Sequence, residues 1–197
     1  MKIVLASGST TRARLFRAAG LDFETDLPRV DEETIRTALL ADGVSPRDIA
    51  DALAEAKARK VSSRHPGAVT IGSDQVLDLD GEILSKPADP DAARAQIARL
   101  SGRRHSLHTA IVAYEDAEPV WRHLTSVRLT MRPLSEGYID EYVARNWPEI
   151  GDSPGAYRLE EEGMRLFTAV EGDFFSVQGM PMLPLLSWMI DRGYLAA

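Results

Sequence analysis

The stretch LASGSTTR, residues 5–12, joins a strand to a helix and decides the start of the fold. The segment that enters it, Lys2–Ala6, is largely apolar and predicts a short buried strand, while Ser7–Thr11 predicts a small, hydroxyl-rich loop. Thr10 or Thr11 is expected to cap a helix that runs to about Ala19. A polar loop at the end of a strand is typical of open α/β sheets, which place their functional sites there.

Outward from this stretch, helical and strand patterns alternate along the chain. Further helices are predicted at about 45–62, 89–100, 135–146 and 182–192, and strands at 69–79, 82–85, 105–114 and 120–131. Asp80-Gly81 predicts a hairpin turn between two of the strands. Because this order mixes long crossovers with adjacent antiparallel pairs, we expect an α/β fold on a central mixed sheet flanked by helices. We find no repeat and no linker, so residues 1–197 are expected to form a single domain.

The charge balance and composition exclude several classes of function. The chain has 23 basic and 30 acidic side chains, a net charge of −7, so it would repel a polymeric nucleic acid. It has no cysteine, which excludes disulfides, a thiol nucleophile and cysteine-ligated zinc. No apolar run is long enough for a membrane span or a signal peptide, and we expect no membrane partner and a cytoplasmic location.

The loop at residues 7–12 has the composition of a phosphate-binding site. Its backbone N–H groups, the hydroxyls of Ser7 and Ser9 and the positive end of a helix dipole converge, and Arg12 can bind phosphate oxygens in bidentate fashion. No GK[ST] sequence follows, so this is not a Walker loop. Many strand-to-helix turns are rich in Ser and Gly for capping alone, which leaves that alternative open for the loop taken by itself.

GSDQV, residues 72–76, places Asp74 in an otherwise apolar strand. An unpaired carboxylate there is costly, so Asp74 needs a metal, a cation or a catalytic role. Glu32 supplies a further acid, and Lys57 and Lys86 supply positive charge. With a divalent cation, Mg²⁺ or Mn²⁺, these groups are the inventory that neutralises a triphosphate and activates water. The alternative is that all of them except Asp74 form ordinary surface ion pairs.

Three patterns resemble other sites but fail on chemistry. GDSPG at 151–155 matches a serine-hydrolase elbow, but Pro154 lacks the N–H that the oxyanion needs. DLDG at 78–81 resembles an aspartyl-phosphatase motif, but it lies in mid-chain, where a hairpin turn is the better interpretation. His105 and His108 lie in a predicted strand and would point to opposite faces, so hydrogen bonding is favoured over zinc binding.

The chain resembles the Maf family of nucleoside triphosphate pyrophosphatases along nearly its whole length. The matching segments are LASGSTTR at 5–12, VDE at 30–32, AKA at 56–58, GSDQV at 72–76, DGEILSKP at 80–87, SGRRHSLHT at 101–109, GAYRLE at 155–160 and VEGDFFSVQGMP at 170–181. The resemblance implies an α/β fold of the Maf and inosine triphosphatase kind, with two lobes around a nucleotide cleft, and a homodimer. It also implies hydrolysis of a nucleoside triphosphate to the monophosphate and pyrophosphate, which removes modified or non-canonical nucleotides.

The same resemblance assigns roles to individual residues. Asp74 corresponds to the catalytic carboxylate that accepts a proton from water, and Glu32 with Asp74 corresponds to the metal side. The positions that correspond to phosphate-binding residues are Ser7, Ser9, Arg12, Lys57 and Lys86.

Three positions bear on which base is bound. Gln75 and Glu160 resemble the subgroup that prefers 7-methyl-GTP, whereas Thr and Gln are typical of the dTTP/UTP subgroup. The first subgroup carries Trp where this chain has Thr11, and the family's SPRR is Ser9-Thr10-Thr11-Arg12 here. We therefore expect a 7-methyl-GTP pyrophosphatase, with a dTTP/UTP pyrophosphatase and a non-catalytic, nucleotide-binding regulator of septum formation as alternatives.

Overall fold

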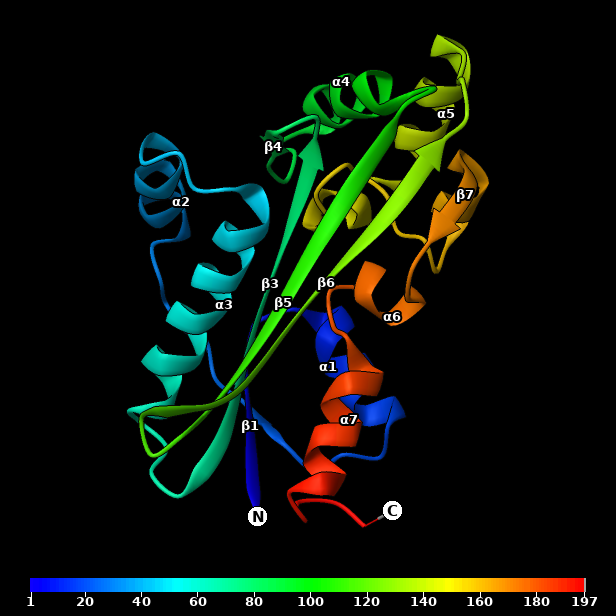
Figure 1. The fold of residues 1–197 in the computed structure, drawn as a ribbon. Helices are drawn as coiled ribbons and strands as arrows, with labels where there is room; N and C mark the ends of the chain where they lie inside the picture. The colour runs from blue at the N-terminus through cyan, green and yellow to red at the C-terminus, as the bar shows by residue number, and fades with distance from the viewer. Residues whose placement is uncertain (197) are drawn as a thin grey trace. The chain divides into compact units, whose positions relative to one another are not determined.

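The structure of the chain is a computed structural model, and it describes residues 1–196. These residues form two compact units. The first unit comprises residues 1–75, 109–125 and the described residues from Asp173 onward, and the second comprises residues 76–108 and 126–172. Three long strands begin in one unit and continue into the other (Figure 1): β3 (Ala68–Leu79), β5 (Arg104–Glu115) and β6 (Glu118–Met131).

Within residues 1–196, one mixed sheet of seven strands contains all the strands, and it confirms the expected α/β fold. The strand order is β2-β1-β3-β5-β6-β7, and β4 pairs with β3 outside this path. The shorter strands are β1 (Lys2–Ala6), β2 (Glu24–Thr25), β4 (Glu82–Leu84) and β7 (Phe167–Glu171). β1 runs parallel to β2 and β3, whereas β4 and β7 pair antiparallel with β3 and β6. The parallel register sets Ala6 opposite Gly72, so the loop after β1 starts beside the residues that precede Asp74.

Helices account for most of the remaining described chain. They are α1 (Thr10–Ala18), α2 (Glu32–Ala41), α3 (Pro46–Ser62), α4 (Pro90–Leu100), α5 (Glu136–Asn146), α6 (Phe174–Val177) and α7 (Met182–Asp191), with short 3₁₀ turns η1 (Glu149–Asp152) and η2 (Glu162–Leu166). The predicted starts of α3 and α4 are confirmed, because Ser45 and Asp89 cap them and proline follows each cap. The predicted cap of α1 is wrong: the Ser9 side chain accepts from the Arg12 N–H, so Thr10 and Thr11 lie inside the helix.

In the first unit, residues that alternate along the strands enter two different cores. Ile3 and Leu5 pack with residues of α1 and α7, whereas Val4 and Ala6 pack with Val61 of α3. Within this unit, α2 and α3 accordingly lie on one side of the strands, and α1 and α7 lie on the other (Figure 1).

The contact of α3 with β3 is very close at Gly72. A Cβ atom at this glycine would lie 2.4 Å from the Ala54 carbonyl oxygen and 2.6 Å from the Ala58 nitrogen, so no larger residue fits. This approach of helix to strand places Lys57, which precedes Ala58, against Asp74 on β3. The glycine of the GSDQV segment is therefore what allows the buried ion pair described below.

The second unit contains the helices α4 and α5, which pack against each other, and residues 76–79 of β3, 104–108 of β5 and 126–131 of β6. Its interior is rich in aromatic rings, and Tyr157 packs edge-to-face on Phe167 with ring centroids 4.8 Å apart. His105 is buried beside both rings, and its Nε2 is 2.8 Å from the Tyr157 hydroxyl.

Candidate active site

The loop that follows β1 folds into a compact cluster of donors. The Ser9 N–H donates to the Ser7 Oγ at 3.1 Å, and the Arg12 N–H donates to the Ser9 Oγ at 3.3 Å. Arg12 also turns its guanidinium back, with one terminal nitrogen 3.4 Å from the Ser7 Oγ. The structure therefore brings Ser7, Ser9 and Arg12 together at the N-terminus of α1, where the helix dipole favours an anion.

Asp74 and Lys57 form a buried ion pair beside this loop. The Lys57 Nζ lies 2.6 Å from Oδ1 of Asp74, and both residues are only 6% exposed. The same ammonium lies 2.9 Å from Oε1 of Glu32, which stands at the N-terminus of α2. One lysine thus gathers the two carboxylates that the sequence assigned to a metal or to catalysis.

The electrostatic environment suits Asp74 to accept a proton. Burial raises the pKa of the Asp74 carboxyl, and the positive charges of Lys57 and Arg12 oppose that shift. Burial likewise lowers the pKa of the Arg12 guanidinium, and the negative charges of Asp74 and Glu32 oppose it. A carboxylate whose pKa is raised is a stronger base than an exposed aspartate, and the neighbouring cations favour its ionised form.

A backbone turn at residues 176–179 holds Arg12 in place. The Gly179 carbonyl accepts from the Arg12 Nε at 2.8 Å and from the Ser73 hydroxyl at 2.9 Å. Gly179 has a φ of +87°, and a Cβ atom there would lie 3.3 Å from the guanidinium nitrogens of Arg12. Residues 170–181 match the family in sequence, but no role was predicted for this turn, and Gly179 is its one local signal of a special backbone conformation.

Gln75 fastens the same turn to the sheet. Its Nε2 donates to the carbonyls of Ser176 at 2.9 Å and Val177 at 3.1 Å and to the Thr109 hydroxyl at 2.9 Å. Thr109 in turn donates to the Ser176 carbonyl at 2.9 Å. Because the amide nitrogen is occupied by this turn, Oε1 is the part of the Gln75 amide that remains for other partners.

The other predicted residues are placed as follows. Thr11 is half-buried in the first turn of α1, one residue before Arg12. Lys86 is exposed on the loop between β4 and α4, and Glu160 is half-buried in the turn before η2. Both belong to the second unit. The structure brings together the predicted phosphate-binding, metal and catalytic residues of the first unit: Ser7, Ser9, Arg12, Glu32, Lys57 and Asp74.

The two gathered carboxylates fit a cation that is shared with a phosphate. Lys57 contacts only Oδ1 of Asp74 and Oε1 of Glu32, which leaves the second oxygen of each carboxylate outside the ion pair. Within residues 1–196, no group of three or more His, Asp or Glu side chains gathers to hold a metal by itself. Mg²⁺ is often bound by one or two carboxylates plus substrate phosphates, and this donor set matches that pattern.

The DLDG segment and the two histidines have structural roles, as the sequence predicts. Asp78 accepts from the Gly81 N–H at 2.6 Å, and the segment forms the predicted hairpin turn between β3 and β4. His108 bonds to Ser126 at 2.7 Å and to Asp78 at 3.2 Å, while His105 bonds to Tyr157. Both histidines are thus used in hydrogen bonds.

Comparison with known proteins identifies the family. A family model described as "Maf-like protein" matches residues 2–191. The chain belongs to the Maf family. A Maf protein named nucleoside triphosphate pyrophosphatase from Ruegeria pomeroyi is 55% identical over 97% of this chain and 96% of its own. One of the same name from Sphingopyxis alaskensis is 50% identical over 98% of both chains. Among solved structures, a HAM1 protein from Coxiella burnetii aligns with 66% of this chain and 73% of its own, at 18% identity and a TM-score of 0.45.

The helices carry no sign of a membrane span. None of the helices within residues 1–196 is both long and apolar enough to cross a bilayer.

Proposed function

We propose that this Maf-family protein hydrolyses a nucleoside triphosphate to the nucleoside monophosphate and pyrophosphate. The observation that carries the proposal is the buried Asp74–Lys57–Glu32 cluster, which lies beside Arg12 and the serine loop. The relatives that match nearly the whole chain are named nucleoside triphosphate pyrophosphatases, which supports the same reaction. The cytoplasm, which holds the nucleotide pool, is the proposed location.

In this reaction Asp74 removes a proton from water, and the water oxygen forms a bond to the α-phosphorus. The bond from that phosphorus to the α,β-bridging oxygen breaks, and pyrophosphate leaves with the electron pair. Arg12, Lys57 and Lys86 neutralise the charge that develops on the leaving pyrophosphate. When bound by Glu32 and Asp74, Mg²⁺ or Mn²⁺ supplies further neutralisation of the phosphates.

We propose 7-methyl-GTP as the substrate. A guanine edge presents N1–H and N2–H₂ donors, which the Glu160 carboxylate accepts together, and a 7-methylated ring adds a positive charge that a carboxylate stabilises. The Gln75 amide supports this, because its nitrogen is held by the 176–177 carbonyls and its oxygen is an acceptor. Thr11 is too small to stack on a base, so binding lacks the contribution of about 1–3 kcal/mol that a tryptophan would give there.

A nucleotide panel with product identification tests these proposals. The purified protein, with Mg²⁺ or Mn²⁺, is given 7-methyl-GTP, GTP, dTTP and UTP, and we expect pyrophosphate from all substrates and the highest kcat/KM for 7-methyl-GTP. A preference of about tenfold or more for dTTP or UTP, a factor worth about 1.4 kcal/mol, contradicts the base assignment only. Release of orthophosphate contradicts the reaction itself. Binding without turnover would point instead to a nucleotide-binding regulator.

We also propose that two copies of the chain associate through α7. Leu183 and Ile190 are exposed on this helix, at 59% and 38%, and their spacing of seven residues puts them on one helical face. Burial of such a face in a second copy removes its apolar surface from water. We expect light scattering to give a dimer mass for the wild type and a monomer mass for Leu183→Glu; a wild-type monomer contradicts the proposal.

A further inference from the structure

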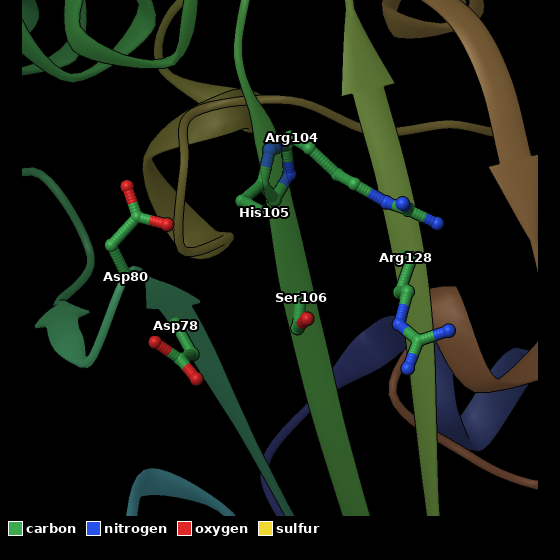
Figure 2. A pocket seen from close by; sticks show the side chains of 6 residues that line it. All are labelled: Asp78, Asp80, Arg104, His105, Ser106 and Arg128. Carbon is green, nitrogen blue, oxygen red and sulfur yellow. The ribbon is translucent and has the colours of Figure 1, made fainter.

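The second unit contains a pocket of about 500 Å³ that lies outside the residues assigned to catalysis. Its lining comes from the ends of neighbouring strands: Asp78, Asp80, Arg104, His105, Ser106 and Arg128. Figure 2 shows the carboxylates of Asp78 and Asp80 on one side of β5 and the guanidinium groups of Arg104 and Arg128 on the other, with Ser106 between them. The pocket therefore has a negative and a positive side.

The positive side has unused binding capacity at Arg128. The chain has more acidic than basic side chains, and neighbouring arginines are paired: Arg104 with Glu171 at 2.6 Å, and Arg103 with Asp80. The exposed guanidinium of Arg128 has neither an ion pair nor a hydrogen bond to any described residue. In a protein with excess carboxylates, an arginine without a carboxylate partner in a pocket is available for an anionic ligand.

Ser106 adds a hydroxyl donor between the two sides. It is half-buried, and its Oγ makes no hydrogen bond within the described chain. Because side chains alternate along a strand, Ser106 shares a face of β5 with Arg104. An oxyanion that binds Arg128 can accept from this hydroxyl and also from Arg104, whose ion pair with Glu171 uses only one of its terminal nitrogens.

The negative side is fixed as an acceptor by a hydrogen-bonded chain. Asp78 can only accept when ionised, so His108 donates to it through Nε2, at 3.2 Å. In the neutral imidazole the His108 Nδ1 is then the acceptor for the Ser126 hydroxyl, at 2.7 Å. Asp78 is thereby oriented on the pocket wall, where its carboxylate can accept from hydroxyl groups of a ligand.

From this arrangement we infer that the pocket binds a small phosphomonoester that carries hydroxyl groups, a compound of the sugar-phosphate class. The phosphate contacts Arg128, Ser106 and Arg104, and the hydroxyls donate to Asp78 and Asp80. The volume of about 500 Å³ is within the range of small-molecule sites. Such a compound has no phosphoric anhydride bond, so the pocket is a binding site and not a second site of the proposed hydrolysis.

The test is a titration of the ¹⁵N-labelled full chain with ribose 5-phosphate and, separately, with inorganic phosphate. We expect amide shifts at Ser106, Arg128 and Asp78 with both compounds, and tighter binding of ribose 5-phosphate because only it offers hydroxyl donors to the acids. Shifts confined to residues 7–12, or no shifts, overturn the inference. Equal affinity for both compounds overturns the assignment to a sugar phosphate, since the acids would then take no part.

Variants separate this pocket from the catalytic cluster. Arg128→Gln and Ser106→Ala should each weaken ribose 5-phosphate binding, the first by about tenfold or more as expected for a lost charge-assisted contact. Arg128→Lys keeps the charge and should retain part of the affinity for ribose 5-phosphate. The control Arg47→Gln removes an exposed charge outside the pocket lining and should leave that affinity unchanged. Unchanged affinity in both Arg128→Gln and Ser106→Ala refutes the site, and melting curves of each variant confirm that it is folded.

Discussion

Replacement of Lys57 by methionine tests the buried ion pair at the centre of the proposed site. Lys57 is 6% exposed, and its ammonium lies 2.6 Å from Asp74 and 2.9 Å from Glu32, so Lys57→Met leaves a buried carboxylate without this counter-ion. Removal of one partner of a buried pair costs about 3–5 kcal/mol, and we expect a loss of that size in the free energy of unfolding. Asp74→Asn, made in the Lys57→Met background, removes the orphaned charge and should recover at least about 1 kcal/mol.

Urea unfolding followed by tryptophan fluorescence measures these energies. Trp121 and Trp188 stack with ring centroids 5.0 Å apart in the same unit as the ion pair, so their signal reports on that unit. EDTA is present throughout, which keeps metal binding out of the comparison. The control is Lys60→Met, which removes an exposed lysine from the same helix and should change stability by less than about 0.5 kcal/mol. Additive effects of Lys57→Met and Asp74→Asn, within about 0.5 kcal/mol, would refute the coupling.

The remaining predictions concern the fold, the turn that holds Arg12 and the base. Burial lowers the pKa of His105 to about 4, so the unfolded chain binds a proton at this histidine at a higher pH than the folded chain does. The contribution of His105 to stability is therefore full above about pH 6.5 and falls by about 3 kcal/mol as the pH drops toward 4. Thermal melts over this pH range should show the loss in the wild type, and His105→Asn should lack this contribution to it. Gly179→Ala should lower kcat/KM about tenfold for every triphosphate, because the added methyl group crowds Arg12. The control is Gly193→Ala, since Gly193 also has a positive φ but a Cβ there would meet no atom within 4 Å; this variant should keep its kcat/KM. Equal losses in the two variants would mean that backbone strain alone causes them. Glu160→Gln should lower kcat/KM for 7-methyl-GTP relative to UTP about tenfold, and an unchanged ratio removes Glu160 from base recognition.

Some of the fold was predictable because its signals are local. The apolar Lys2–Ala6 segment, the Ser45 and Asp89 caps and the Asp80-Gly81 turn each act within a few residues, and the structure confirms them. α2 was not predicted. Its apolar residues Ile35 and Leu39 are spaced for one helical face, but they are only half-buried and no residue of α2 is buried, so the helix contributes little to a core. The cap of α1 was assigned one or two residues too late, to Thr10 or Thr11 in place of Ser9, because three adjacent hydroxyl residues can all serve as caps.

In the candidate site, too, local signals predicted some residues, whereas contacts between distant segments were not predictable. Asp74 was predictable because a carboxylate within an apolar strand is costly and needs a partner. The partnership of Lys57 with Asp74 depends on the close approach of α3 to Gly72, which involves residues far apart in the sequence. The turn that orients Arg12 joins Ser73, Thr109 and Gly179 from three distant segments, and no local pattern connects them.

The most direct test of the central claim is the fate of the water oxygen during turnover. The protein is incubated with its preferred triphosphate and a divalent cation in oxygen-18-labelled water, and the products are analysed by mass spectrometry. We expect label in the nucleoside monophosphate and none in the pyrophosphate. We also expect Asp74→Asn to lower kcat by about 10²- to 10⁴-fold, whereas the control Asp91→Asn, at an exposed position, should not. Label in the pyrophosphate, release of orthophosphate, or activity of Asp74→Asn within a few-fold of the wild type would contradict it.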